Sequence, residues 1–172
     1  MKIKFILPAI FVCLLAGNLF AQTTNYKAHA IFVFSIAKYS QWPSSGAGNS
    51  FVIAVLGKTK LYDELAASAA NHSINGMKIS VVQVNEIAEI KQPQMVLVAD
   101  SKSGALSDLI KATANQPVMI VTEREGLHKK GAGVSFFVND AGKLNFDLNL
   151  TDLNKRTITL SKSLTSLAAS TL

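Results

Sequence analysis

Short apolar runs separated by polar or alanine-rich segments dominate the hydrophobic pattern from residue 51 to residue 121. The run 51–56 is continuously apolar, rich in β-branched residues and followed by Gly57, which predicts a strand covered on both faces. Further strands are predicted at 78–84, 94–99 and 118–121, with helical segments at 61–70, 85–90 and 102–115 between them. Because parallel strands need crossover connections, this alternation favours right-handed crossovers and a mostly parallel sheet.

The C-terminal part of the chain has a different pattern. Residues 133–138 and 143–150 flank the turn-forming stretch 139–142, which predicts a β-hairpin. Apolar and polar residues alternate in its second strand, so we expect one face to meet solvent and the strand to form an antiparallel edge. Apolar positions between Leu160 and Ala168 predict a closing amphipathic helix. The predicted fold class is α/β: a single domain with a mostly parallel sheet, flanking helices and a C-terminal antiparallel hairpin.

A very apolar helix is predicted over residues 26–41. Its apolar positions recur at helical spacing and cover more than one stripe: Ala28, Ile31, Phe32, Val33, Phe34, Ile36, Ala37 and Tyr39. Trp42 and Pro43 end the helix, because proline disfavours the α region for the residue before it. A helix this apolar is either buried on most sides or has a second apolar face for a partner.

The N-terminus has the pattern of a targeting segment. Lys2 and Lys4 precede the apolar run 5–15, and Ala21 is the kind of small residue at which a signal peptidase cleaves. We predict a signal peptide at 1–21 and a single domain at 22–172, with an uncleaved anchor as the alternative. The single cysteine, Cys13, lies in the apolar run, so the remaining chain cannot form a disulfide and its stability must come from a core.

The charges are mildly basic overall and scattered along the chain. The formal net charge is +6, and only Lys129-Lys130 and Lys155-Arg156 are adjacent basic pairs. No dense basic patch alternates with aromatic residues, so we do not expect nucleic acid as a partner. A weak preference for an acidic partner or an anionic surface is one interpretation of the charge, and solubility alone is the other.

The sequence contains few patterns typical of catalytic or metal-binding sites. His29, His72 and His128 form no pair at metal-ligand spacing, so no metal is expected and a structural or solvated role is predicted for each. Residues 131–136 contain two glycines but enter a predicted strand instead of following one, so they lack the context of a dinucleotide site. Ser135 is not in a nucleophile elbow. The chain is therefore expected to be neither an enzyme nor a cofactor-binding protein.

One ligand site is suggested by the sheet topology. Open parallel sheets bind ligands outside the carboxyl ends of their strands. These ends would supply Lys58, Thr59, Asp100, Ser101, Thr122, Glu123 and Arg124 as a possible pocket for a small polar molecule. The alternative is that strand-to-helix loops are polar in general and that Ser101 or Ser103 simply caps a helix.

Several segments together resemble the YfiR-like family of periplasmic regulatory proteins. They are F-S-I-A-K-Y-x-x-W-P at 34–43, F-V-I-A-V-L-G at 51–57, P-V-M-I-V-T at 117–122, K-G-A-G-V-S-F at 130–136, L-N-F-D-L-N at 144–149 and I-T-L-S-K-S-L at 158–164. The resemblance implies a non-enzymatic periplasmic α/β domain. It would bind and repress a membrane-anchored diguanylate cyclase, affecting cyclic-di-GMP signalling and biofilm behaviour, or serve a sensor kinase.

The resemblance also assigns the 26–42 segment a possible second role. Phe34, Lys38 and Trp42 form a possible interface with the extracytoplasmic domain of that partner or with a second copy in a homodimer. The alternative is that Phe34 belongs to the core. Redox control through disulfides, which the family's cysteines allow, is not carried over because this chain has no cysteine after the signal peptide. A periplasmic small-molecule-binding sensory module is the alternative function.

Overall fold

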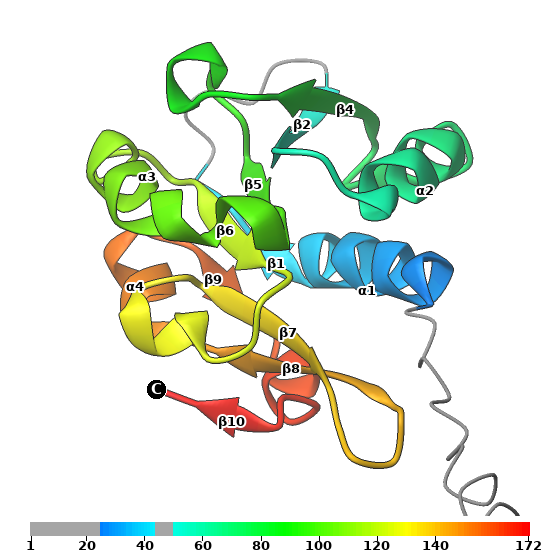
Figure 1. The fold of residues 1–172 in the computed structure, drawn as a ribbon, viewed down its shortest axis with the longest axis vertical. Coiled ribbons are helices and arrows are strands. Elements are labelled where there is room, and N and C mark those ends of the chain that lie inside the picture. Colours follow the sequence, from blue (N-terminus) through cyan, green and yellow to red (C-terminus); the bar gives the residue numbers. More distant parts are fainter. Residues whose placement is uncertain (1–24, 44–49) are drawn as a thin grey trace, which may run out of the picture.

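The computed structural model describes residues 25–43 and 50–172 (Figure 1). One sheet has the strand order β10-β8-β7-β6-β5-β2-β4-β3, and β1 and β9 form a separate pair. The strands are β1 (Ser40–Gln41), β2 (Ser50–Leu56), β3 (Ser73–Ile74), β4 (Met77–Val84), β5 (Met95–Val98), β6 (Met119–Thr122), β7 (Val134–Val138), β8 (Leu144–Leu148), β9 (Thr159–Leu160) and β10 (Ser170–Thr171). The predicted signal peptide (1–21) and most of the predicted loop at 44–50 lie outside the described residues.

The helices are α1 (Tyr26–Lys38), α2 (Lys60–Ala69), α3 (Leu106–Ala112), α4 (Leu150–Lys155) and α5 (Lys162–Thr165). Short 3₁₀ helices are η2 (Ile87–Glu89), η3 (Asp100–Ala105) and η4 (Leu127–Lys130). None of the helices in the described part of the chain combines the length and apolar character required to cross a bilayer.

The central strands run parallel, as the sequence predicts. β4, β2, β5, β6 and β7 pair in parallel, whereas β3–β4 and β7–β8 are antiparallel hairpins. Asn75 and Gly76 make the tight turn between β3 and β4, and both adopt the positive φ that such turns require. The fold is therefore α/β with a mostly parallel sheet and a C-terminal antiparallel hairpin, which confirms the predicted class.

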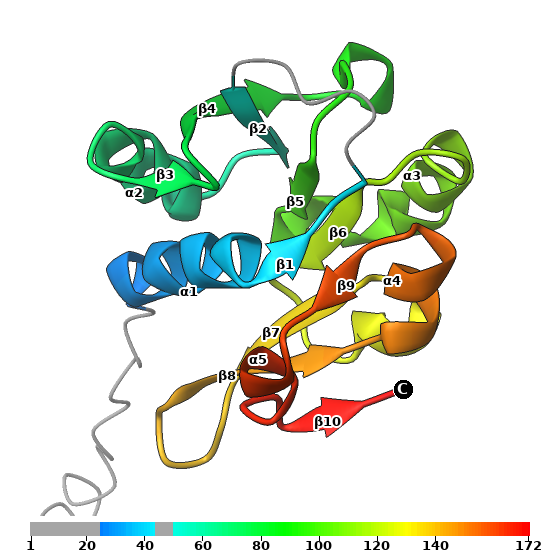
Figure 2. The ribbon, with the colours of Figure 1, turned by 180° about the vertical axis from the view of Figure 1, so that it is seen from behind.

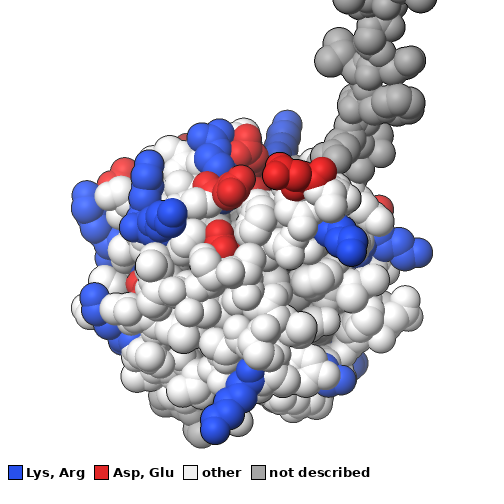
Figure 3. All heavy atoms as spheres, turned by 90° about the horizontal axis from the view of Figure 1, so that it is seen from below, with Lys and Arg blue, Asp and Glu red and all other residues white. Residues whose placement is uncertain are grey.

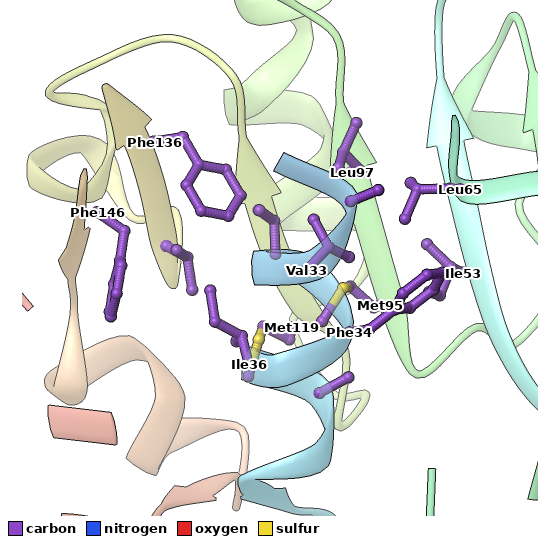
Figure 4. Close-up of a cluster of buried hydrophobic side chains, with 14 of the residues drawn as sticks. Val33, Phe34, Ile36, Ile53, Leu65, Met95, Leu97, Met119, Phe136 and Phe146 are labelled. Carbon is purple, nitrogen blue, oxygen red and sulfur yellow. The ribbon is translucent and has the colours of Figure 1, made fainter. Parts of the chain in front are cut away.

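The central strands are covered on both faces because apolar side chains alternate along them. In β5, Met95 and Leu97 point into one cluster, whereas Val96 and Val98 point into another. α1 covers the first face (Figure 4), and α3 covers the second through Leu106 and Leu109. This two-sided burial explains why the strands are continuously apolar in the sequence.

Two predictions about β8 are wrong. The strand is not an edge, because β10 pairs with it in parallel on the side away from β7. The face of β8 that carries its polar residues is also not fully exposed to solvent, because Asp147 is only 8% exposed. The Ser170 hydroxyl donates a hydrogen bond to Asp147 Oδ1 over 2.6 Å, and His128 Nδ1 lies 3.4 Å from the other carboxylate oxygen. These partners come from distant segments, so the local alternation could not indicate them.

Helix α1 ends earlier than its pattern predicts. The Asn25 side chain accepts a hydrogen bond from the Ala28 N–H at its start. At its end the Ser40 hydroxyl donates to the Ile36 carbonyl over 2.6 Å, and Ser40 then pairs with Leu160 as part of β1. The helix therefore stops at Lys38 instead of Gln41, because residues 40–41 join a strand contributed by the far end of the chain.

Three other predicted helices are shorter or differently placed. The 85–90 segment is only the turn η2, and Asn85 does not cap it. The 102–115 helix begins as η3 and becomes α3 at Leu106. The closing helix at 160–168 is the single turn α5 between β9 and β10. Hydroxyl groups there bond to backbone carbonyls, as Thr165 does to Ser161, and such local bonds compete with a longer helix.

Trp42 fixes the exit from α1 onto the sheet. Its ring meets Phe51 edge to face, with 5.0 Å between centroids, and its indole N–H donates to the Gln94 carbonyl over 3.1 Å.

The substitution Trp42→Phe keeps an aromatic ring on Phe51 and removes the hydrogen bond. We expect the free energy of unfolding to fall by about 1 kcal/mol in a denaturant titration. Tyr39→Phe is the control, because Tyr39 is half exposed; an equal loss in both variants would contradict the assigned role.

Candidate functional site

Four of the seven residues predicted for a strand-end pocket do come together. Glu123, after β6, accepts a hydrogen bond from the Thr59 hydroxyl over 2.7 Å and one from the Asp100 N–H over 3.1 Å. Arg124 donates to both carboxylate oxygens of Asp100, over 2.7 and 3.2 Å. The loops after β2, β5 and β6 are thus joined at one edge of the sheet, as the parallel topology requires.

The ionisation of this cluster reflects burial and pairing. Burial raises the pKa of the Glu123 carboxyl, and the hydrogen bonds from Thr59 and from the Asp100 N–H partly offset that rise. The Arg124 guanidinium, bonded to Asp100, lowers the pKa of that carboxyl below its usual range. Both carboxylates therefore have partners from the chain itself, which makes the cluster a brace between loops.

The other three predicted pocket residues lie apart from this brace. Lys58 and Ser101 are exposed and take no part in its hydrogen bonds. Thr122 is fully buried, and its hydroxyl lies 3.1 Å from the Arg124 carbonyl oxygen and not against a side chain of the brace. Its hydroxyl lies between β6 and β7, where it donates to Ser135 Oγ over 3.0 Å. Their polarity in the sequence indicated strand ends correctly, but it could not indicate on which side of the strand each side chain lies.

A buried polar cluster under β7 and β8 has the residue types of a hydrolytic triad but not its geometry. His128 Nδ1 lies 3.4 Å from Asp147 Oδ2, and the His128 side chain is 2% exposed. Ser135 Oγ accepts a hydrogen bond from the backbone N–H of His128, not from its ring. Because Ser135 is fully buried, its hydroxyl cannot meet a substrate. The cluster connects η4 to the hairpin and, through Ser170, to β10.

The described residues contain no group of three or more His, Cys, Asp or Glu side chains that could hold a metal ion. His29 is buried in α1, with its ring 5.5 Å from that of Phe136. Burial lowers the pKa of its imidazole, so the neutral form is favoured in the folded protein.

The clearest surface feature is an apolar groove between α1 and α5. It has a volume of about 320 Å³ and is lined by Ile31, Phe32, Ser35, Ile36, Tyr39, Phe146, Ser163, Leu164 and Leu167. Figure 2 shows α5 below α1, with β8 passing behind α5. Ile31, Tyr39 and Leu167 on the rim are 53%, 50% and 71% exposed. Exposed apolar side chains gathered around a concave surface are typical of interaction sites.

The residues predicted for an interface lie in different environments. Phe34 is only 5% exposed and packs against His72, with 4.8 Å between ring centroids, so the core alternative holds for this residue. Trp42 is half-buried and bonded to Gln94, whereas Lys38 is exposed beside Tyr39 at the groove. Of the two alternatives for this apolar helix, burial on most sides or a second apolar face, the exposed Ile31 and Tyr39 favour the second, and that face does not include Phe34.

Thr59 has two structural roles, whereas the exposed ion pair between Arg124 and Asp100 has one. Its hydroxyl bonds Glu123 and also accepts the Leu61 N–H as the N-cap of α2. We expect Thr59→Val to lower the free energy of unfolding by about 1–2 kcal/mol in urea. Arg124→Gln should have a smaller effect, because the Arg124–Asp100 pair is exposed to solvent. Equal losses in the two variants would show that the brace is not centred on Glu123.

His29 should make stability depend on pH. Its folded-state pKa lies below the ordinary value of about 6.5, so the unfolded chain binds the proton more readily. The stabilisation is fully present above about pH 6.5 and is lost as the pH falls through the folded-state pKa. His29→Phe should flatten this part of a stability–pH profile measured by urea titration. A slope unaffected by His29→Phe would contradict the assignment.

A family model and solved structures of other proteins match this chain. Residues 26–169 match the model of the YfiR/HmsC-like family. A conserved domain protein from Vibrio cholerae O1 biovar eltor has a similar structure, with a TM-score of 0.58 and 14% identity over 87% of this chain. An ABC domain from Streptococcus pneumoniae, solved in complex with L-Trp, has a TM-score of 0.56 and 8% identity over 86% of this chain.

The chain spans 60% of the length of each of these two solved chains. At such low identities the two likenesses show the fold alone. No curated protein matches the sequence. The family match covers nearly all of the described residues, from the start of α1 to the residue before β10. The chain therefore belongs to the YfiR/HmsC-like family.

Proposed function

We propose that this protein is a periplasmic regulator that binds the extracytoplasmic domain of a membrane-anchored signalling protein, of the diguanylate cyclase type, and represses it. The proposal makes the protein a binding module and not an enzyme. Its effect would reach cyclic-di-GMP signalling and biofilm behaviour through the partner. The family match supports the class of function, and the apolar groove between α1 and α5 supports action through contact with another protein.

The groove is the observation on which the proposal depends. Four polar residues at the strand ends, Thr59, Asp100, Glu123 and Arg124, bond to one another, and the buried cluster around His128 is closed to solvent. The groove instead presents Ile31, Tyr39 and Leu167 to solvent at its rim. Covering such side chains contributes roughly 25 cal/mol per Å² of apolar surface, which favours a bound state.

The alternative function, a sensory module that binds a small polar molecule at the strand ends, has less support. Its key groups, the carboxylates of Asp100 and Glu123 and the guanidinium of Arg124, already bond to one another or to Thr59. A ligand would have to replace these bonds. Control by thiol oxidation is not part of the proposal, because the sequence contains only Cys13.

Repression by binding needs a preference for one state of the partner. A regulator shifts a two-state cyclase only by the difference between its affinities for the inactive and active forms. A hundredfold preference for the inactive form stabilises that form by about 2.7 kcal/mol when the regulator is saturating. The regulator itself needs no moving part, so a domain whose sheet is packed on both faces is compatible with this role.

The proposal predicts inhibition that requires the partner's extracytoplasmic domain. The purified protein is added to a full-length membrane-anchored diguanylate cyclase from the same organism, reconstituted in liposomes with the extracytoplasmic side accessible, and cyclic-di-GMP synthesis is measured. We expect synthesis to fall in a saturable manner. The isolated cytoplasmic catalytic domain of the same cyclase is the control and should be unaffected. Equal inhibition of both, or no inhibition and no binding, would overturn the proposed function.

A further inference from the structure

The charged side chains on the two helices that form the groove are all basic. Lys27, Ile31, Ser35 and Lys38 follow one another at spacings of four, four and three residues, so they share the outer face of α1. Lys27 and Lys38 are exposed, as is Lys162 at the start of α5. The apolar side chains of this wall are thus bracketed by ammonium groups at both ends of the helix.

Acidic side chains are missing from both walls. Neither α1 nor residues 161–172 contain Asp or Glu. The floor comes from Phe32, Ile36 and Phe146, and the neighbouring Asp147 points to the opposite face of β8, where His128 and Ser170 hold it. Figure 3 shows one face of the protein on which basic side chains are spaced around a largely uncharged area, with acidic ones gathered toward the upper edge of the view.

This charge pattern argues against a second copy as the occupant. In a two-fold symmetric dimer the same patch lies on both subunits, so Lys27, Lys38 and Lys162 of one copy would face those of the other. No carboxylate on either wall could compensate them. Like charges brought together at an interface cost several kcal/mol. A partner with carboxylates beside apolar side chains would meet the same surface without that cost.

We propose that the groove between α1 and α5 binds an amphipathic segment of the partner, whose apolar side chains enter between Ile31, Tyr39 and Leu167 and whose Asp or Glu side chains lie against Lys27, Lys38 and Lys162. This inference rests on the proposed function for the identity of the partner. It adds the surface, the chemistry of the bound segment and the sign of its charge. A cavity of about 320 Å³ holds the few apolar anchors that dominate such contacts.

The apolar part of the inference is tested with charged substitutions at exposed positions. Ile31→Glu and Leu167→Glu introduce a carboxylate into the groove at side chains that are already more than half exposed, so the fold should be retained, as checked by circular dichroism. Val82→Glu is the matched control, because Val82 is 40% exposed on β4 and away from the groove. Binding to the purified extracytoplasmic domain of the cyclase should weaken by about tenfold or more in the groove variants and stay unchanged in the control.

The charge part is tested with two synthetic amphipathic helical peptides that share one apolar face, one flanked by Glu and the other by Lys. The full-length exported protein should bind the Glu-flanked peptide more tightly, and added salt should reduce the difference. The double variant Lys38→Glu with Lys162→Glu should reverse the preference. The double variant Lys129→Glu with Lys130→Glu makes the same change of net charge on η4 and should keep the wild-type preference.

The outcomes separate this inference from the proposed function. If the wild-type protein binds the cyclase domain and the groove variants bind it equally well, the partner uses another face and the inference is wrong, while the function stands. If the peptides bind without regard to charge, the inference is also overturned. If sedimentation equilibrium shows a wild-type dimer that Ile31→Glu dissociates, the groove is a self-association surface. If the Glu-flanked peptide is preferred but the cyclase domain does not bind, the proposed function fails and the groove chemistry holds.

Discussion

The packing of α1 across the middle of the sheet is the constraint on which the rest of the structure depends. Val33, Ile36 and Ala37 are completely buried there against β strands that are themselves covered by α3 on the other face. Because the buried side of α1 is packed against the sheet, the orientation of its exposed side is also fixed. The Ile31–Tyr39 face is therefore held rigidly beside α5, and the groove between them is preformed. Preformed apolar surfaces lose little entropy on binding, which suits a protein whose proposed role is contact.

The buried carboxylates and the buried guanidinium of this fold connect segments of the chain, so they are not free to bind a ligand or to act in catalysis. Glu123 draws the loops after three strands together, and Asp147 joins η4, β8 and β10. Arg156, nearly buried, bonds Asp152 and the Thr113 carbonyl and so connects α4 to the end of α3. Carboxylates and cations that are satisfied in this way stabilise the connections between layers, because a buried charge without a partner would be costly.

The sequence allowed the central strands of the sheet to be predicted, but not the helix ends or the short strands contributed by the two ends of the domain. Strands β2, β4, β5 and β6 were recognisable because burial on both faces requires continuous apolar runs, which are local signals. The early end of α1 and the strand at 159–160, where a helix was predicted to begin, were not recognisable, because both depend on pairing between residues 40–41 and 159–160. Asp147 had the spacing of a solvent-facing residue, yet His128 and Ser170 bury it from distant positions.

The candidate site shows the same division between local and distant information. Polar residues at the strand ends could be located from topology, but whether they bind a ligand or one another depends on side-chain direction. The groove was indicated only by the excess of apolar residues in α1. Its second wall comes from Leu164 and Leu167, which the pattern assigned to a closing helix without showing which face it would meet. Apolar periodicity identifies a face but not its neighbour.

The short pair β1–β9 has a consequence for the order of folding. It joins residues separated by 118 positions in the chain, as the contact between Gln41 and Thr159 shows. Closing such a long loop is entropically expensive, and contacts of this kind tend to form late. The two walls of the groove lie just beyond this pair at each end of the chain, so the groove can exist only after the whole domain has been synthesised and closed. An incomplete chain would have no site to offer, and only the finished fold would be competent to engage a partner.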